Sequence, residues 1–229
     1  MNFSNNKTPQ NQSQTEKVVK SWSNPEIISK KSPTCKDVLK TANLSPMMVH
    51  YCQTKTGLTD PANTILFYRL GDFYEMFFED ATLVSKELEL TLTGKDCGME
   101  ERAPMCGIPY HAAEGYINRL VENGHKVAIC EQMEDPKQAK GMVKREVIRV
   151  VTPGTTLIPQ GLDETKNNYI MSIVCMEGCF GISTADISTG QCFVTEMDKP
   201  RRLVDEITKF MPAEIICNQS FLLCGIDVE

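Results

Sequence analysis

The sequence is poor in the residues that build metal sites and histidine-dependent catalytic centres. Its 229 residues include three histidines and one tryptophan. Ten cysteines are present, but no two have the C-x-x-C spacing of a zinc ligand pair, and Cys175 and Cys179 have no histidine near them. We therefore expect no metal, and no Ser, Cys or carboxylate arrangement beside His111 suggests a catalytic triad.

Long hydrophobic runs are also missing. The first 45 residues are polar, so this stretch offers neither a signal peptide nor a membrane-spanning segment. The pattern favours a cytoplasmic protein with no membrane partner. In that compartment the ten cysteines are expected to be reduced and mostly buried thiols.

An excess of positive charge is the third feature that the chain lacks. The formal net charge is −6, whereas generic nucleic-acid binders carry basic patches that neutralise phosphates. Only residues 1–45 are basic, with seven Lys or Arg against three Asp or Glu. If the chain contacts DNA, most of the phosphate binding must come from elsewhere.

An aromatic run from Leu66 to Phe78 is the most distinctive stretch that is present. It predicts two short strands around a Gly71-Asp72 turn, because aromatic residues favour strands and Gly beside Asp marks a reversal. Side chains alternate along a strand, so Phe73 and Glu75 share one face. A carboxylate on the same face as an aromatic ring departs from the usual separation of buried and charged side chains.

Two interpretations of this face remain open from the pattern alone. In the first, Phe73 and Phe77 are core residues and Glu75 reaches solvent from a frayed edge. In the second, Phe73 is an exposed wedge and Glu75 is a hydrogen-bonding partner beside it, because flat aromatic side chains inserted at base steps kink DNA.

Five motifs in one order carry a family resemblance. The segment Gly71-Asp72-Phe73-Tyr74-Glu75-Met76-Phe77 resembles the signature of the mismatch-recognition domain of the MutS family of DNA mismatch repair proteins. The flanking motifs fit the same family and cover about residues 45–155, with weaker similarity to the end of the chain; they are 45-SPMM-48, 106-CGIPYHA-112, 127-VAICEQ-132 and 150-VVTPGT-155.

The resemblance implies a function and its residues. Phe73 would enter mismatched or unpaired double-stranded DNA from the minor groove, Glu75 would hydrogen-bond the same base, and Pro104 and Met105 would line the groove. It also implies a nucleoid-associated location, a homodimer partner and a MutL-like partner. The family's ATP and Mg²⁺ site belongs to a C-terminal domain, so this chain is expected to hold no cofactor and not to be an enzyme. No Walker A motif is present, since Asp96 follows Gly94-Lys95 where Ser or Thr is required.

The alternation of helical and strand patterns predicts an α/β chain with a mixed sheet. We expect a disordered polar tail at 1–43, a mismatch-recognition domain at 44–155, a linker at 156–166 and an incomplete ribonuclease-H-like connector domain at 167–229. Helices are predicted at 46–56, 79–88, 112–123 and 201–211, and strands at 66–70, 73–78, 89–93, 126–132, 143–151, 169–176, 179–187, 191–197 and 214–217. Ser45 is expected to cap the first helix, and the apolar face of the last helix is expected to be Leu203, Val204, Ile207 and Phe210.

Two other functional classes are weighed against mismatch recognition. A nuclease built on the ribonuclease-H-like part would need several clustered carboxylates. Asp186 is the acid considered for that role, and the predicted strands of this part before the last helix hold only one other acid, Glu196. An inactive fragment or protein-interaction module without DNA binding is the other alternative.

Overall fold

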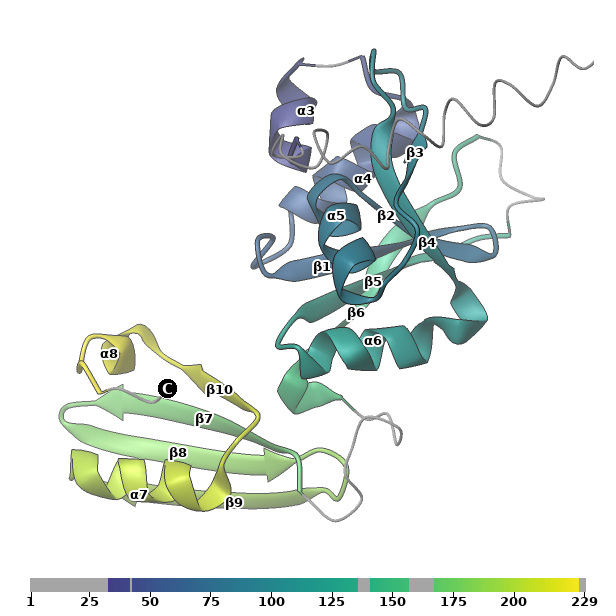
Figure 1. Cartoon of the computed structure of the whole chain (residues 1–229). Coiled ribbons are helices and arrows are strands. Elements are labelled where there is room, and N and C mark those ends of the chain that lie inside the picture. Colours follow the sequence, from purple (N-terminus) through teal and green to yellow (C-terminus); the bar gives the residue numbers. More distant parts are fainter. Residues whose placement is uncertain (1–32, 42, 136–140, 157–166, 227–229) are drawn as a thin grey trace, which may run out of the picture.

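The computed structural model describes residues 33–41, 43–135, 141–156 and 167–226, which form two β-sheets with flanking helices (Figure 1). The first sheet has the order β3-β4-β2-β1-β5-β6. β1 and β5 run parallel, whereas the pairs β1–β2, β2–β4, β3–β4 and β5–β6 are antiparallel. The predicted mixed sheet is confirmed; its strands are β1 (Thr64–Leu70), β2 (Phe73–Phe77), β3 (Thr93–Lys95), β4 (Ala103–Pro109), β5 (Lys126–Gln132) and β6 (Arg145–Val151).

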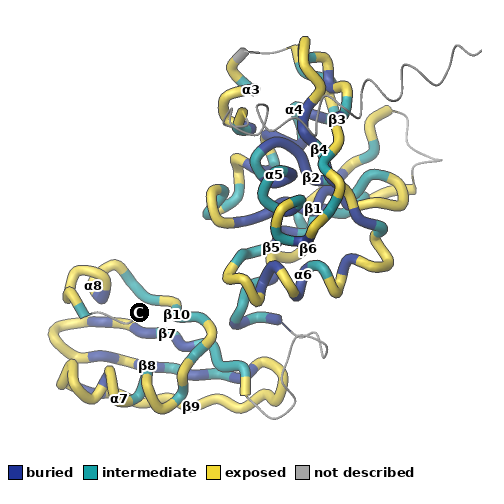
Figure 2. Tube along the Cα trace, viewed as in Figure 1, coloured by how far each residue is buried: buried dark blue, intermediate teal, exposed yellow. Residues whose placement is uncertain are grey.

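Helices cover both faces of this sheet, and the buried interior in Figure 2 follows its central strands. β1 is buried on both sides: Leu66 and Tyr68 pack with residues of α3 (Cys35–Thr41) and α4 (Pro46–Thr56). Ile65 and Phe67 pack with residues of α5 (Phe78–Glu87) and α6 (Ala113–Glu122), which follows the 3₁₀ turn η1 (Tyr110–Ala112). The side-chain period of two therefore sends alternate residues into two separate cores.

Helix α3 corrects the predicted tail. Residues 1–32 of that segment lie outside the described residues, but its last part is helical and buries Cys35 and Val38. The helix begins with a capping arrangement, because Thr34 Oγ1 donates to Asp37 Oδ2 at 2.7 Å and the Asp37 N–H donates to Thr34 Oγ1 at 3.3 Å. This Thr-x-x-Asp spacing can be read in the sequence. The helix was missed because the polar composition of the surrounding residues indicated a disordered tail.

Three local predictions differ from the structure. No strand spans 89–92; Glu89 has φ +55, which ends α5 in a turn, and β3 begins at Thr93. The Ser45 side chain makes no cap hydrogen bond for α4, and its N–H instead donates to Cys97 O at 2.8 Å. Val204, predicted on the apolar face of the last long helix, is 42% exposed.

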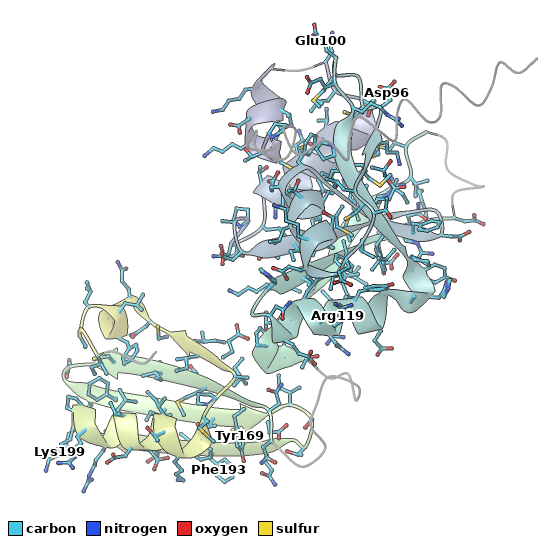
Figure 3. All side chains as sticks on the ribbon, viewed as in Figure 1. Asp96, Glu100, Arg119, Tyr169, Phe193 and Lys199 are labelled. Atoms are coloured by element: carbon cyan, nitrogen blue, oxygen red, sulfur yellow. The ribbon has the colours of Figure 1, made fainter. Side chains whose placement is uncertain are left out.

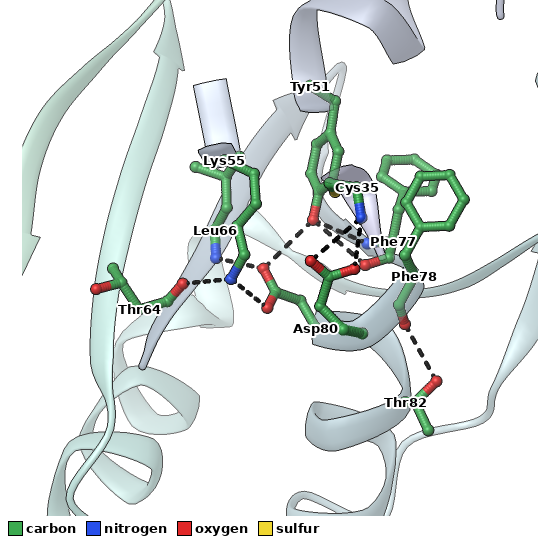
Figure 4. Close-up of polar contacts among 10 residues, drawn as sticks. Cys35, Tyr51, Lys55, Thr64, Leu66, Phe77, Phe78, Asp80 and Thr82 are labelled. Carbon is green, nitrogen blue, oxygen red and sulfur yellow. Dashed lines mark hydrogen bonds and ion pairs between the residues drawn. The ribbon is translucent and has the colours of Figure 1, made fainter. Parts of the chain in front are cut away.

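A buried ion pair joins α4, α5 and β1 (Figure 4). Lys55 Nζ lies 2.6 Å from Asp80 Oδ1 and donates to Thr64 O at 2.6 Å. The other carboxylate oxygen, Oδ2, accepts the Leu66 N–H at 2.9 Å. Burial outweighs the favourable Lys55 charge and raises the pKa of Asp80 to about 6.

The second sheet has the order β10-β7-β8-β9. β7–β8 and β8–β9 are antiparallel hairpins, and β10 returns parallel to β7. Leu203 of α7 (Pro200–Phe210) and Phe221 of α8 (Gln219–Leu222) join its core cluster. This order confirms the predicted α/β connector architecture; its strands are β7 (Tyr169–Met176), β8 (Cys179–Asp186), β9 (Gln191–Met197) and β10 (Glu214–Cys217).

Three aromatic rings from β7, β9 and α7 lie together at the second sheet. The Phe210 ring lies 5.1 Å from the Tyr169 ring and 5.3 Å from the Phe193 ring, measured between centroids. Figure 3 labels Tyr169 and Phe193 beside α7. Phe193 keeps 47% of its surface exposed. All ten cysteines are free and six are buried, which agrees with the prediction of mostly buried thiols.

Candidate nucleic-acid interface

Phe73 begins β2, directly after the turn that joins it to β1. Gly71 adopts φ +59, a left-handed conformation that favours glycine, and the Asp72 carbonyl accepts the Tyr110 N–H at 3.0 Å. Phe73 is 46% exposed, whereas Phe67, Phe77 and Phe78 are fully buried. The interpretation of Phe73 as a core residue is therefore wrong, and that of Phe77 as a core residue is confirmed.

Glu75 lies on a central strand and not at a frayed edge, because β2 pairs with β1 on one side and β4 on the other. Its Oε2 lies 2.5 Å from the Nζ of Lys95, which is on β3. The Glu75 side chain is 15% exposed and that of Lys95 33%. The carboxylate beside the exposed ring is thus neutralised by a cation that comes from a different part of the chain.

A cluster around Arg69 supports the turn that carries Phe73. The Arg69 guanidinium lies 3.6 Å from the centroid of the Tyr110 ring, and its Nε donates to Gly71 O at 2.5 Å. Its Nη1 lies 3.6 Å from Glu131 Oε1, which also accepts the Tyr74 hydroxyl. Burial and the hydrogen bond to Glu131 raise the pKa of Tyr74, so this hydroxyl keeps its proton at neutral pH.

Sequence reasoning did not identify Arg69, Tyr110 or Lys95 as part of this site. Arg69 was recognisable as the one cation inside the aromatic run. The other two carried no local signal, because they reach the hairpin only through strand pairing and the turn after β4.

Pro104 and Met105 are not beside Phe73. Pro104 is buried and Met105 is half-buried against the core that α3 and α4 cover. The β4 residues that pair with Phe73 and Glu75 are Pro109 and Gly107. Met105 pairs with Phe77 and therefore shares the sheet face of Phe73 and Glu75, whereas Pro104 points to the opposite face of β4.

Metal-dependent nuclease chemistry has no support in the described parts of the chain. There, no group of three or more His, Cys, Asp or Glu side chains is placed to hold a metal ion. Asp186, the acid considered for that role, is 1% exposed. Its Oδ1 accepts the Ser188 N–H at 2.8 Å and the Ser188 hydroxyl at 2.6 Å, so this carboxylate caps a turn.

No helix formed by the described residues is long and apolar enough to cross a membrane.

Comparison with known proteins agrees with the two-sheet division. Residues 45–159 match the family model for MutS domain I, and residues 168–223 match MutS domain II. A protein named DNA mismatch repair protein MutS from Lachnoclostridium phytofermentans is 65% identical over 188 residues, which are 82% of this chain and 20% of that protein. Proteins of the same name from Alkaliphilus metalliredigens and Acetivibrio thermocellus are 56% and 55% identical over 76% and 79% of this chain, and over 20% and 21% of their own lengths.

The chain thus spans about a fifth of the length of the relatives that it matches. The region compared is the one that contains the exposed Phe73 and the connector-like sheet. Because the model for MutS domain I alone matches half of the chain and the model for domain II follows it in order, the chain belongs to the MutS family of DNA mismatch repair proteins.

Proposed function

We propose that the chain recognises mispaired or unpaired bases in duplex DNA by inserting Phe73 from the minor groove. The observation that supports this most directly is the exposure of Phe73, at 46%, in a run whose other phenylalanines are buried. The names of the relatives, DNA mismatch repair protein, support the same role. A ring on a turn braced by Arg69 loses little conformational freedom when it stacks on a base.

The proposed discrimination is indirect readout. Base–aromatic stacking contributes about 1–3 kcal/mol per base, and unstacking a base step costs a few kcal/mol. These terms nearly cancel at a correct pair. At a mismatch the unstacking cost is lower, and the balance then favours insertion of Phe73.

Glu75 is proposed to reject intact duplex and to hydrogen-bond the unstacked base. An ionised carboxylate near phosphates is repelled, so Glu75 weakens binding wherever the base contact does not form. Lys95, 2.5 Å from Glu75, offsets part of this charge in the free protein. We propose that the Lys95 ammonium turns to a phosphate when Glu75 engages a base.

The proposed domain organisation keeps the expected boundaries with one extension. Residues 44–155 form the mismatch-recognition domain, α3 packs onto it, residues 156–166 form a linker, and residues 167–229 begin the connector domain. For a longer protein that carries this region, we propose the other properties that the resemblance implies: an ATP-dependent clamp, a homodimer and a MutL-like partner.

The test is fluorescence anisotropy with matched and mismatched duplexes at low salt, about 50 mM, because affinity falls steeply as salt rises. A 2-aminopurine base beside the mismatch reports unstacking. We expect weak binding that prefers the mismatch and is accompanied by a fluorescence increase.

Phe73→Ala should remove both the mismatch preference and the fluorescence increase. Phe193→Ala is the matched control, because Phe193 has nearly the same exposure, 47%, on the second sheet. Equal loss in both variants, or unchanged discrimination in Phe73→Ala, refutes the wedge role. Absence of binding to either duplex favours the alternative of an interaction module.

A further inference from the structure

The turn that follows β6 contacts the second sheet through Glu214. This turn, η2 (Pro153–Thr155), follows Thr152 at the end of the first sheet. Glu214 is the first residue of β10, where it pairs with Ile170 of β7. Its Oε2 accepts the Thr152 hydroxyl at 2.5 Å and the Gly154 N–H at 3.3 Å. In Figure 1 the chain passes through this turn between the two sheets.

Hydrogen bonds within the turn join Thr152 to Thr155 without the help of Glu214. The Thr152 N–H donates to Thr155 Oγ1 at 3.0 Å, and the two threonine hydroxyls lie 2.7 Å apart. Each hydroxyl has one proton. Because the Thr152 hydroxyl donates to Glu214, its oxygen is free to accept from the Thr155 hydroxyl. Arg149 Nη2 donates to Thr155 O at 3.3 Å, which fixes the turn to β6.

Gly154 leaves no space between the turn and the second sheet. A Cβ added at Gly154 would lie 2.8 Å from Glu214 Cβ and 3.2 Å from Ile170 Cβ. Its nearest neighbours therefore belong to the other sheet. A further hydrogen bond crosses the same junction, since Asn168 Nδ2 donates to Pro153 O at 2.9 Å.

We infer that Glu214 holds the mismatch-recognition part and the connector part together as one rigid body. Three hydrogen bonds and a close-packed glycine fix the end of β6 to the start of β7 and β10. A rotation of the first sheet would then be passed to the second sheet. This role does not depend on the proposed wedge.

The test is solution NMR of the full chain, with residual dipolar couplings measured separately for the two sheets. In the wild type, one alignment tensor should describe both sheets. Glu214→Ala removes the acceptor, and Gly154→Ala places a methyl group against Glu214 and Ile170. In both variants the common tensor should be lost, while each sheet retains its own chemical-shift pattern.

Gly115→Ala is the matched control, because nothing lies within 4 Å of a Cβ added there, and the common tensor should persist. If Glu214→Ala or Gly154→Ala fails to fold, Thr152→Val provides a milder change that removes one hydroxyl at nearly constant volume. Two unrelated tensors in the wild type would overturn the inference. So would a common tensor that survives in Glu214→Ala or, where that variant does not fold, in Thr152→Val.

Discussion

Replacing Asp80 with Asn tests whether the buried ion pair holds the recognition domain together. The carboxylate is 5% exposed and the Lys55 side chain 3% exposed, so neither group is solvated by bulk water. Asn keeps an acceptor for the Leu66 N–H but removes the charge that compensates Lys55. Breaking a buried pair by removing one partner costs about 3–5 kcal/mol, which is a large part of the 5–15 kcal/mol that typically stabilises a domain.

Urea unfolding at pH 7, followed by circular dichroism, gives the free energy of unfolding. We expect Asp80→Asn to lose about 3 kcal/mol or more. The double variant Lys55→Met with Asp80→Leu should lose less than Asp80→Asn, because it buries no unpaired charge. If Asp80→Asn lowers the free energy of unfolding by less than about 1 kcal/mol, the range for an exposed pair, then the ion pair does not stabilise the domain as its burial indicates.

Three further predictions concern the hairpin that carries Phe73. Glu75→Gln removes the repulsion of phosphates, so matched duplex should bind more tightly by about 1 kcal/mol, roughly fivefold; weaker binding to matched DNA in anisotropy would argue against this role. Arg69→Lys keeps the charge but loses the planar contact with Tyr110, and thermal unfolding should show a loss of about 0.5–2 kcal/mol with a smaller mismatch preference; an unchanged preference would remove Arg69 from the site. Gly71→Ala meets no neighbouring atom but is strained at φ +59, so it should cost about 1–2 kcal/mol in the same unfolding assay; no loss would mean that the turn adopts another conformation.

Much of the fold was predictable because its signals are local. Predicted and observed bounds agree at β5, β7, β9, β10 and α4. In each case the strand or helix period, together with a flanking glycine or proline, lies within a dozen residues. The predicted strand at 89–93 was wrong because the left-handed Glu89 continues the end of α5, and this conformation has no glycine to reveal it.

Only part of the candidate site could be predicted from the sequence. The Phe73–Glu75 pair follows from the two-residue period of a strand, and the family motif was readable directly. Proximity in sequence to the motif 106-CGIPYHA-112 does not give the register of β4 on β2, so the sequence alone could not place Pro104 and Met105 relative to Phe73. That register pairs Pro109 with Phe73 and leaves Pro104 buried.

The sequence by itself determined the family, most of the strands and helices, and the placement of an aromatic ring and an acid on one strand face. These depend on composition and on contacts between residues close along the chain. The tertiary structure alone decided that Phe73 is exposed while Phe77 is buried, that Lys95 neutralises Glu75, and that Glu214 receives the turn after β6. Each of these depends on which distant segments pack together, and packing is set by the whole core rather than by any local pattern.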